Sequence, residues 1–341
     1  MRPALAALVL LSLVPGRAFA LPDDDGPFTA TSEVDTLQTG PSQVQATVCL
    51  PDASGPRPLI ALASNATEGR DVLAGLCLHL ATYGFIAVIP DLGYTNTDAS
   101  SIGTTLLDSL TLLEREGART GSRFEGRVDA VHRAVLGFNT GATGALFAAA
   151  TDDSLSAAIL LDPQDLTGQA RSLAPQVRRV PVLLVNADPN ACNGNDSASG
   201  LYAALAGPRA TLHVIQASDC DAEWPASVTC QGACGLSHGY AAKYFRQFAT
   251  AYAAYFAGCQ AEMRAYVDGA AVEEGLTDRT LDHVDAQQLP SGCGPYVALD
   301  AGAADAGASG DGCNTAAGAP SVPLLLVLGA LALTMGRRLR A

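Results

Sequence analysis

Basic side chains are scarce in this 341-residue chain. It has 20 Lys and Arg against 34 Asp and Glu, which gives a net charge of −14. Several of the arginines lie in the two terminal segments, so the rest of the surface is more acidic still. A protein that binds nucleic acid needs a basic face toward the phosphates. The shortage of basic residues therefore argues against a nucleic-acid partner.

Long apolar runs are also few, and the N-terminal one is short. It extends from Ala4 to Val14, whereas a helix that crosses a membrane must span about 30 Å of hydrocarbon. Arg2 precedes this run, and a small-residue ending at Ala18 and Ala20 follows it. The pattern is typical of a secretory signal peptide at residues 1–20, with an N-terminal anchor as the alternative. We therefore expect the protein to be exported.

The C-terminal segment, residues 313–341, combines a cysteine, a marginal apolar span and an arginine cluster. Cys313 precedes the apolar residues 321–336, and three arginines follow them. Basic residues after such a span form a stop-transfer arrangement. The order resembles the myxobacterial C-terminal sorting tag, which implies cleavage near Cys313 and anchoring at the cell surface or outer membrane. A permanent single-pass anchor is the alternative, and in both cases only this segment contacts a membrane.

The other cysteines number eight in a chain that we expect to be exported. An even number in an oxidising compartment favours disulfides, although the sequence does not give their pairing. Zinc is the alternative for one group, but its spacing is not that of a usual ligand set. The eight are Cys49, Cys77, Cys192, Cys220, Cys230, Cys234, Cys259 and Cys293, and the zinc alternative would use Cys220, Cys230, Cys234 and His238.

Residues 188–196, "DPNACNGND", are rich in oxygen ligands. An extra residue before Gly194 interrupts the calcium-loop pattern. We therefore expect an Asx-turn loop anchored by a disulfide here, and the sequence indicates neither a metal nor a cofactor.

Short apolar or β-branched runs alternate with helical stretches through most of the chain. Seven such runs predict strands, and the pattern is typical of an α/β fold with a mostly parallel sheet and helices on both faces. The runs are residues 43–50, 58–64, 85–91, 134–138, 157–162, 181–187 and 211–217. We place this domain at 21–262, a cysteine-containing appendage at 263–300 and a flexible Ala/Gly/Asp linker at 301–312. Nothing in the sequence indicates the oligomeric state.

The order "PLIALASN", "RAVLGFNTGATG", "AAILLDPQD", "PVLLVNADPN" and "ASDCD" resembles the α/β-hydrolase superfamily over about residues 40–258. It is similar to the branch that holds chlorophyllase-like, dienelactone-hydrolase-like and cutinase-like or polyester-hydrolase-like proteins. The resemblance implies an α/β-hydrolase fold. It also implies a catalytic serine on a strained turn, a histidine that takes its proton and an acid that orients the histidine.

Matched to these motifs, the chain departs from the family at the catalytic positions. Asn139 stands at the serine position, with Gly137 and Gly141 kept for the sharp turn. Asp219 stands at the histidine position, where a carboxylate of pKa about 4 would be a weak base. The turn is therefore retained without its hydroxyl group.

The acid and oxyanion positions depart as well. Asn190 matches the acid position best by spacing, with Asp188 as the alternative. Ser64 and Asn65 stand where the oxyanion loop usually has His-Gly. Together these departures predict a catalytically inactive pseudo-hydrolase with a binding or structural role.

The four positions Asn139, Asp219, Ser64 and Asn65 should line a polar cleft at the carboxyl ends of the strands. Such a cleft could hold a small polar or ester-like ligand. The alternative function is an active carboxylic ester hydrolase, chlorophyllase-like or cutinase-like, with a non-standard catalytic set. The replacement residues in that case would be Thr140 and His238.

Overall fold

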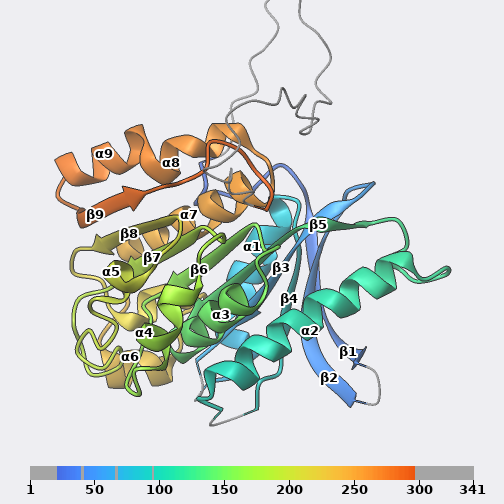
Figure 1. The fold of residues 1–341 in the computed structure, drawn as a ribbon, viewed down its shortest axis with the longest axis horizontal. Coiled ribbons are helices and arrows are strands. Elements are labelled where there is room, and N and C mark those ends of the chain that lie inside the picture. The colour runs from blue at the N-terminus through green and yellow to red at the C-terminus, as the bar shows by residue number, and fades with distance from the viewer. Residues whose placement is uncertain (1–20, 40–41, 66–67, 94–95, 296–341) are drawn as a thin grey trace, which may run out of the picture. The chain divides into compact units, whose positions relative to one another are not determined.

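A computed structural model describes residues 21–39, 42–65, 68–93 and 96–295 of the chain (Figure 1). The expected signal peptide, the linker, the end of the appendage and the sorting tag with Cys313 lie outside these residues. Within the described ranges, no helix combines the length and the apolar character that a membrane crossing requires. The apolar segment 321–336 is not among them.

The described residues form one nine-stranded sheet with the strand order β1-β2-β4-β3-β5-β6-β7-β8-β9. The six neighbouring strands from β4 to β8 in this order are parallel, and antiparallel strands flank them on both sides. The predicted α/β fold with a mostly parallel sheet is therefore confirmed. The strands are β1 (Ala30–Thr39), β2 (Ser42–Pro51), β3 (Arg57–Ala63), β4 (Ile86–Pro90), β5 (Val128–Phe138), β6 (Ala157–Leu161), β7 (Val182–Asn186), β8 (Arg209–Val214) and β9 (Leu281–Gln287).

Helices cover both faces of the sheet, because successive side chains of a strand point to opposite faces (Figure 1). Ile60 and Leu62 of β3 pack with α1 and α7, whereas Leu59 and Ala61 pack with α2 and α3. The helices are α1 (Ala74–Thr82), α2 (Ala99–Ala118), α3 (Thr140–Thr151), α4 (Gln169–Leu173), α5 (Leu201–Ala204), α6 (Val228–Cys234), α7 (Gly239–Phe256), α8 (Ala265–Asp268) and α9 (Ala270–Thr277). Four 3-10 turns are η1 (Arg70–Leu73), η2 (Ala174–Gln176), η3 (Asp219–Ala222) and η4 (Ala261–Arg264).

All seven predicted strands are present, and the structure adds one strand at each edge of the sheet, β1 and β9. The added strand β9 lies inside the segment predicted as an appendage, residues 263–300. It pairs antiparallel with β8, so the described part of that segment completes the sheet. Both edge strands are rich in polar residues, because one of their sides faces no other strand.

The eight cysteines of the described residues form four disulfides, so the predicted disulfides are confirmed. The pairs are Cys49–Cys77, Cys192–Cys234, Cys220–Cys230 and Cys259–Cys293. The zinc alternative required free thiolates from three of these cysteines and is not supported. Two of the bonds fasten α6, since Cys230 and Cys234 both lie on that helix.

Candidate functional site

The turn between β5 and α3 has the strained geometry expected after this strand. Asn139 has φ 54° and ψ −115°, a backbone conformation that side-chain-bearing residues rarely adopt. A Cβ atom on Gly137 would lie 2.2 Å from the carbonyl oxygen of Gly141, and one on Gly141 would lie 2.4 Å from that of Ala63. Both glycines are therefore required for the chain to make this turn.

The side chain of Asn139 is buried and fully hydrogen-bonded. Its Oδ1 accepts a hydrogen bond from the backbone N–H of Thr140 at 2.8 Å. Its Nδ2 donates to the carbonyl oxygen of Cys192 and to Oδ1 of Asp219, each at 2.9 Å. Both amide hydrogens and the amide oxygen therefore have partners. Asn139 therefore provides no nucleophile at the position where the family's catalytic serine is expected.

Asp219 begins η3, just after β8, and lies against the buried Asp162 at the end of β6. Burial, then the charge of Asp162 and a hydrogen bond with it, raise the pKa of Asp219 to about 9. Burial also raises the pKa of Asp162 to about 6, although its oxygens accept hydrogen bonds from the backbone of Ala187 and the side chain of Asn193. At neutral pH the pair therefore holds one shared proton.

The proton of this pair belongs on Asp219. Its Oδ1 accepts from Asn139, whereas no protein donor faces its buried Oδ2. Asp219 also has the higher pKa of the two groups, and its side chain shares a hydrogen bond with Asp162, so the proton resides on Asp219. An amide, a neutral carboxyl group and a carboxylate thus follow one another from the turn into the protein interior.

Asp162 is a site residue that the sequence-based matching missed. It lies directly after the buried strand β6 in "AAILLDPQD", and its φ of 39° is positive. The available signal was a carboxylate at the carboxyl end of a parallel strand, where ligand sites of such sheets gather. Asp162, rather than a residue after β7, provides the carboxylate that faces Asp219.

The two residues predicted for the acid position lie elsewhere. Asn190 accepts hydrogen bonds through Oδ1 from the backbone of Cys192 at 2.8 Å and Asn193 at 3.2 Å, which is the expected Asx turn. Asp188 lies at the other side of this loop, where its Oδ1 is 2.8 Å from Nε2 of His213. Neither Asn190 nor Asp188 lines the cleft beside Asn139.

The predicted oxyanion-loop residues point in two directions. Asn65 lines the cleft and donates through Nδ2 to Oε2 of Glu68 at 3.0 Å. Ser64 is buried, and its Oγ donates to the backbone oxygen of Glu68 at 3.4 Å. Only Asn65 of this pair therefore reaches the cleft, and Ser64 borders a smaller adjoining cavity of about 110 Å³.

The two alternative catalytic residues are not brought together at the cleft. Thr140 lines it, at the first position of α3. His238 precedes α7 and binds Asp221, to which its backbone N–H donates at 2.6 Å. Its ring Nδ1 is 3.9 Å from the same carboxylate, and half of the side chain is exposed. The residues that line the cleft, all of them described, include no histidine.

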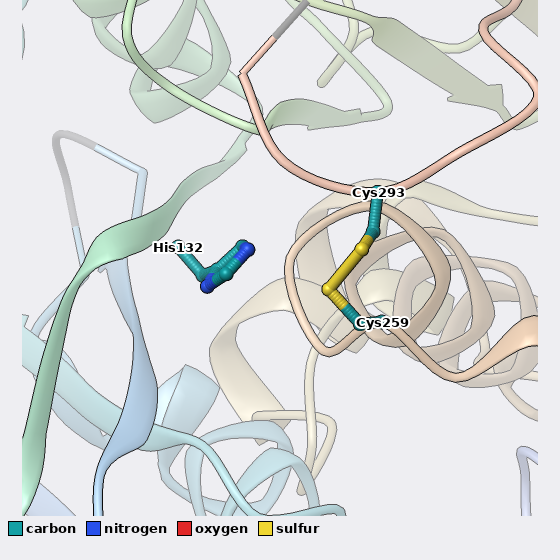
Figure 2. Close-up of side chains that lie close together, drawn as sticks. All are labelled: His132, Cys259 and Cys293. Carbon is teal, nitrogen blue, oxygen red and sulfur yellow. A yellow bond between two sulfur atoms is a disulfide. The ribbon is translucent and has the colours of Figure 1, made fainter. Parts of the chain in front are cut away.

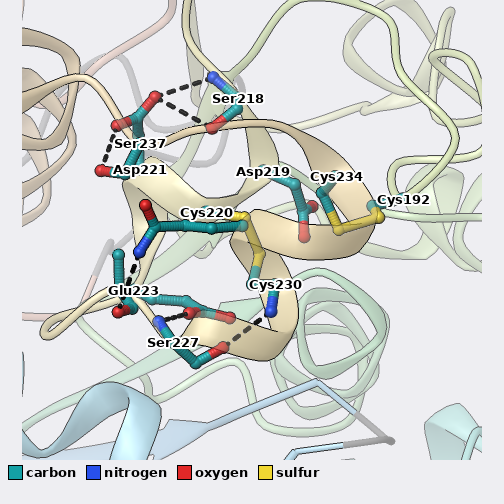
Figure 3. Close-up of a disulfide and its surroundings, with 12 residues drawn as sticks. Cys192, Ser218, Asp219, Cys220, Asp221, Glu223, Ser227, Cys230, Cys234 and Ser237 are labelled. Carbon is teal, nitrogen blue, oxygen red and sulfur yellow. Dashed lines mark hydrogen bonds between the residues drawn. A yellow bond between two sulfur atoms is a disulfide. The ribbon is translucent and has the colours of Figure 1, made fainter.

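The cleft itself has a volume of about 260 Å³, and the residues that line it include no basic side chain. Helix α6 and its two disulfides form one wall, beside Asp219 (Figure 3). At that wall Glu223 is buried, and its burial and a hydrogen bond with Glu68 raise its pKa to about 8. The lining residues are Asn65, Glu68, Thr97, Asn139, Thr140, Gln164, Cys192, Asp219, Thr229, Cys230, Ala233 and Cys234.

Metal-ligating atoms gather at four places in the described residues. Two of these groups lie at α6 and three involve cysteines that are already joined in disulfides. The fourth, His213, Asp282 and His283, lies at the pairing of β8 with β9. None of these three residues lines the cleft beside Asn139.

Comparison with known proteins agrees with the fold. A family model described as PET hydrolase-like matches residues 20–234, from the predicted signal-peptide end to the last residue of α6. A search of the curated proteins gives no match. The family match confirms the resemblance to α/β-hydrolases and covers the turn at Asn139 together with Asp162 and Asp219. The chain therefore belongs to the PET hydrolase-like family of the α/β-hydrolase superfamily.

Proposed function

We propose that this protein is an exported, surface-anchored member of its family that binds a small polar ligand without hydrolysing it. The observation that carries the proposal is the hydrogen bonding of Asn139. Both hydrogens of its Nδ2 are donated within the protein, to Cys192 and Asp219. Hydrolysis by this family's chemistry requires a hydroxyl group at that position and a base beside it.

The electrostatics of the pair behind Asn139 support the same conclusion. A general base must be unprotonated near neutral pH and within reach of the proton that it accepts. Asp219 is the carboxyl group at the cleft that contacts Asn139, but its pKa of about 9 keeps it protonated. Asp162 carries the negative charge, and it is not among the residues that line the cleft. Of this pair, the member that reaches the cleft, Asp219, is therefore not basic at neutral pH, and the basic member, Asp162, does not reach the cleft.

The lining of the cleft favours a neutral polar ligand. Asn65, Thr97, Gln164 and Thr229 offer amide and hydroxyl groups, and Glu68 is the charged side chain among the lining residues when Asp219 is protonated. Without a basic residue in the lining, an anionic ligand would lose hydration without gaining a charge partner. We infer that the ligand is a neutral ester-like or hydroxyl-rich small molecule.

Two measurements on the purified protein test this function. Hydrolysis of a short p-nitrophenyl ester should not exceed the rate of the buffer. The unfolding temperature should rise with a neutral ester-like compound such as triacetin, and Asn139→Ala should reduce that rise because it removes the group that orders the cleft wall. Turnover that Thr140→Ala or His238→Ala abolishes would overturn the proposal in favour of the ester hydrolase.

Surface anchoring is the part of the proposal that rests on the sequence of the chain ends. Cys313 with the apolar residues 321–336 and the arginines after them supports it. Cell fractionation of Cys313→Ala against the natural protein tests it. The variant should leave the surface fraction, and an unchanged distribution would rule out Cys313 as the anchoring residue.

A further inference from the structure

One disulfide, Cys259–Cys293, differs from the other three in its exposure. Cys49–Cys77 and Cys220–Cys230 join buried residues. Cys259, which follows α7, is an exposed residue. Cys259 is therefore the cysteine open to a dissolved thiol, whereas the protein covers the residues of the two buried disulfides.

A histidine faces the same disulfide. His132 of β5 presents one ring nitrogen within 4.8 Å of the sulfur atoms of both Cys259 and Cys293. Figure 2 shows its ring turned toward the sulfur–sulfur bond. Nε2 is the nitrogen on that side, because a Cβ atom on Gly294, the residue after Cys293, would lie 3.5 Å from it.

The other ring nitrogen of His132 is held by a carboxylate. Its Nδ1 is 2.6 Å from Oδ2 of Asp129, three residues earlier in the chain. The carboxylate accepts the Nδ1 hydrogen and fixes the orientation of the ring. Nε2 is then free to accept a proton and to donate it again on the side of the sulfur atoms. Asp129, His132 and the disulfide are thus arranged as an acid, a proton carrier and a reactive sulfur pair.

We propose that Cys259–Cys293 is a thiol-exchange site whose substrates are small thiols and whose proton carrier is His132. His132 takes the proton of an incoming thiol through Nε2, and the thiolate attacks Sγ of Cys259. The sulfur–sulfur bond breaks, and its electron pair leaves on Sγ of Cys293. His132 returns the proton to that sulfur. The products are a mixed disulfide on Cys259 and a thiol on Cys293, so one thiol and one disulfide become one disulfide and one thiol.

Contacts that do not involve sulfur keep the two cysteines close after the bond opens. The loop before and after Cys293 is held to α7 and its neighbours by three hydrogen bonds, which should let the site reclose without unfolding. They are Gly294 N–H to the oxygen of Phe256 at 2.8 Å, Tyr255 O–H to the oxygen of Ser291 at 2.8 Å, and Arg264 Nη1 to the oxygen of Pro290 at 3.1 Å.

Limited reduction of the purified protein tests the site, in a Cys313→Ser background that removes the ninth thiol. Dithiothreitol is added at limiting concentration, free thiols are alkylated, and each disulfide is followed by peptide mass spectrometry. Cys259–Cys293 should open first. His132→Gln should slow its opening by about tenfold or more. Cys192–Cys234 in the same molecules is the internal control and should open at an unchanged rate.

A second probe fixes the direction of attack. Glutathione should form its mixed disulfide on Cys259 and leave Cys293 as the thiol. Asp129→Asn should slow opening less than His132→Gln does, because the imidazole remains but loses its acceptor. If His132→Gln does not fold, the opening rate of Asp129→Asn is compared with that of the natural protein instead. Equal opening rates in the natural protein and the folded variant would show that His132 is not the proton carrier. Glutathione mainly on Cys293 would show that the attack is not on Cys259 and would overturn the proposed step.

Discussion

Asn139 and Asp219 are 80 residues apart in the chain and are joined in the interior by a hydrogen bond of 2.9 Å. Both side chains are almost completely buried, so water has little access to replace a lost partner. A change at one position would leave a buried polar group of the other unsatisfied, at a cost of about 1–3 kcal/mol. The two residues therefore form a unit whose members depend on each other.

The shared proton of Asp219 predicts how stability changes with pH. Its pKa is about 9 when folded against a reference value of 3.8, so between these values the folded protein binds more protons than the unfolded chain. The stability that this group contributes is fully present below the reference value and is lost as pH rises through the folded value. Through this group, the free energy of unfolding changes by at most about 1.4 kcal/mol per pH unit.

Asp219→Asn tests this prediction because an amide repeats the hydrogen bonds of the protonated carboxyl group. Its oxygen can accept from Asn139 and its nitrogen can donate to Asp162. Urea unfolding should give similar stability for both proteins near pH 5, and a more stable variant near pH 8. Parallel stability curves over this range would contradict a proton on Asp219.

Restoring the missing groups should restore hydrolysis. The double change Asn139→Ser and Asp219→His places a hydroxyl group, an imidazole and the existing carboxylate of Asp162 in sequence. We expect hydrolysis of a short p-nitrophenyl ester to rise about 10–100-fold above the unchanged protein, well below a natural triad because the surroundings are not adapted.

The acid of this restored set can be identified by a matched pair of further changes. Asp162→Asn in the double variant should remove the gained activity. Asp188→Asn should leave it, because Asp188 faces His213 instead of position 219. The opposite ranking of these two changes would mean that the acid acts from the end of β7.

The glycines of the turn predict a large difference between two otherwise similar changes. Gly141→Ala would place a Cβ atom 2.4 Å from a backbone oxygen and should lower the free energy of unfolding by about 3 kcal/mol or more. Gly232→Ala is the control, since Gly232 lies in α6 with nothing within 4 Å of its Cβ position. It should be neutral or stabilise by up to about 1 kcal/mol. Chemical denaturation measures both.

The two disulfides of α6 should contribute unequally to stability. Cys192–Cys234 joins residues 42 apart, and Cys220–Cys230 joins residues 10 apart. Loop-closure entropy gives about 4 kcal/mol for the first and about 3 kcal/mol for the second. Pairwise replacement by serine, followed by thermal unfolding, should therefore destabilise more at Cys192 and Cys234. The reverse order would mean that packing around the sulfur atoms outweighs chain entropy.

Much of the fold could be predicted from the sequence because its signals are local. Buried parallel strands are nearly continuous apolar runs, and all six were recognisable, as was the antiparallel strand β2. Gly137 and Gly141 marked the turn at Asn139, because backbone segments that pack this closely leave no room for a Cβ atom and therefore require glycine. The edge strands β1 and β9 left little trace, because their polar residues face solvent on one side.

The interior of the site was harder to predict because it depends on contacts between distant segments. Asp162 faces Asp219 only because the ends of β6 and η3 meet in space, and no local pattern records that meeting. The spacing from Asn139 to Asn190 pointed to a residue whose Oδ1 caps the turn of its own loop, and Asp162 is the residue that faces Asp219. The disulfide pairing could not be predicted from the sequence either, because it also depends on which distant segments meet in the folded protein.

Helix α6 is fastened at Cys230 and again at Cys234, its last residue, to two different parts of the chain. A helix pinned twice within five residues cannot swing aside as a lid. The α6 wall of the cleft is therefore fixed in place, and a ligand must fit against this wall as it stands. Recognition by such a preformed site depends on shape complementarity, and its rate of entry should follow diffusion instead of waiting for a conformational change.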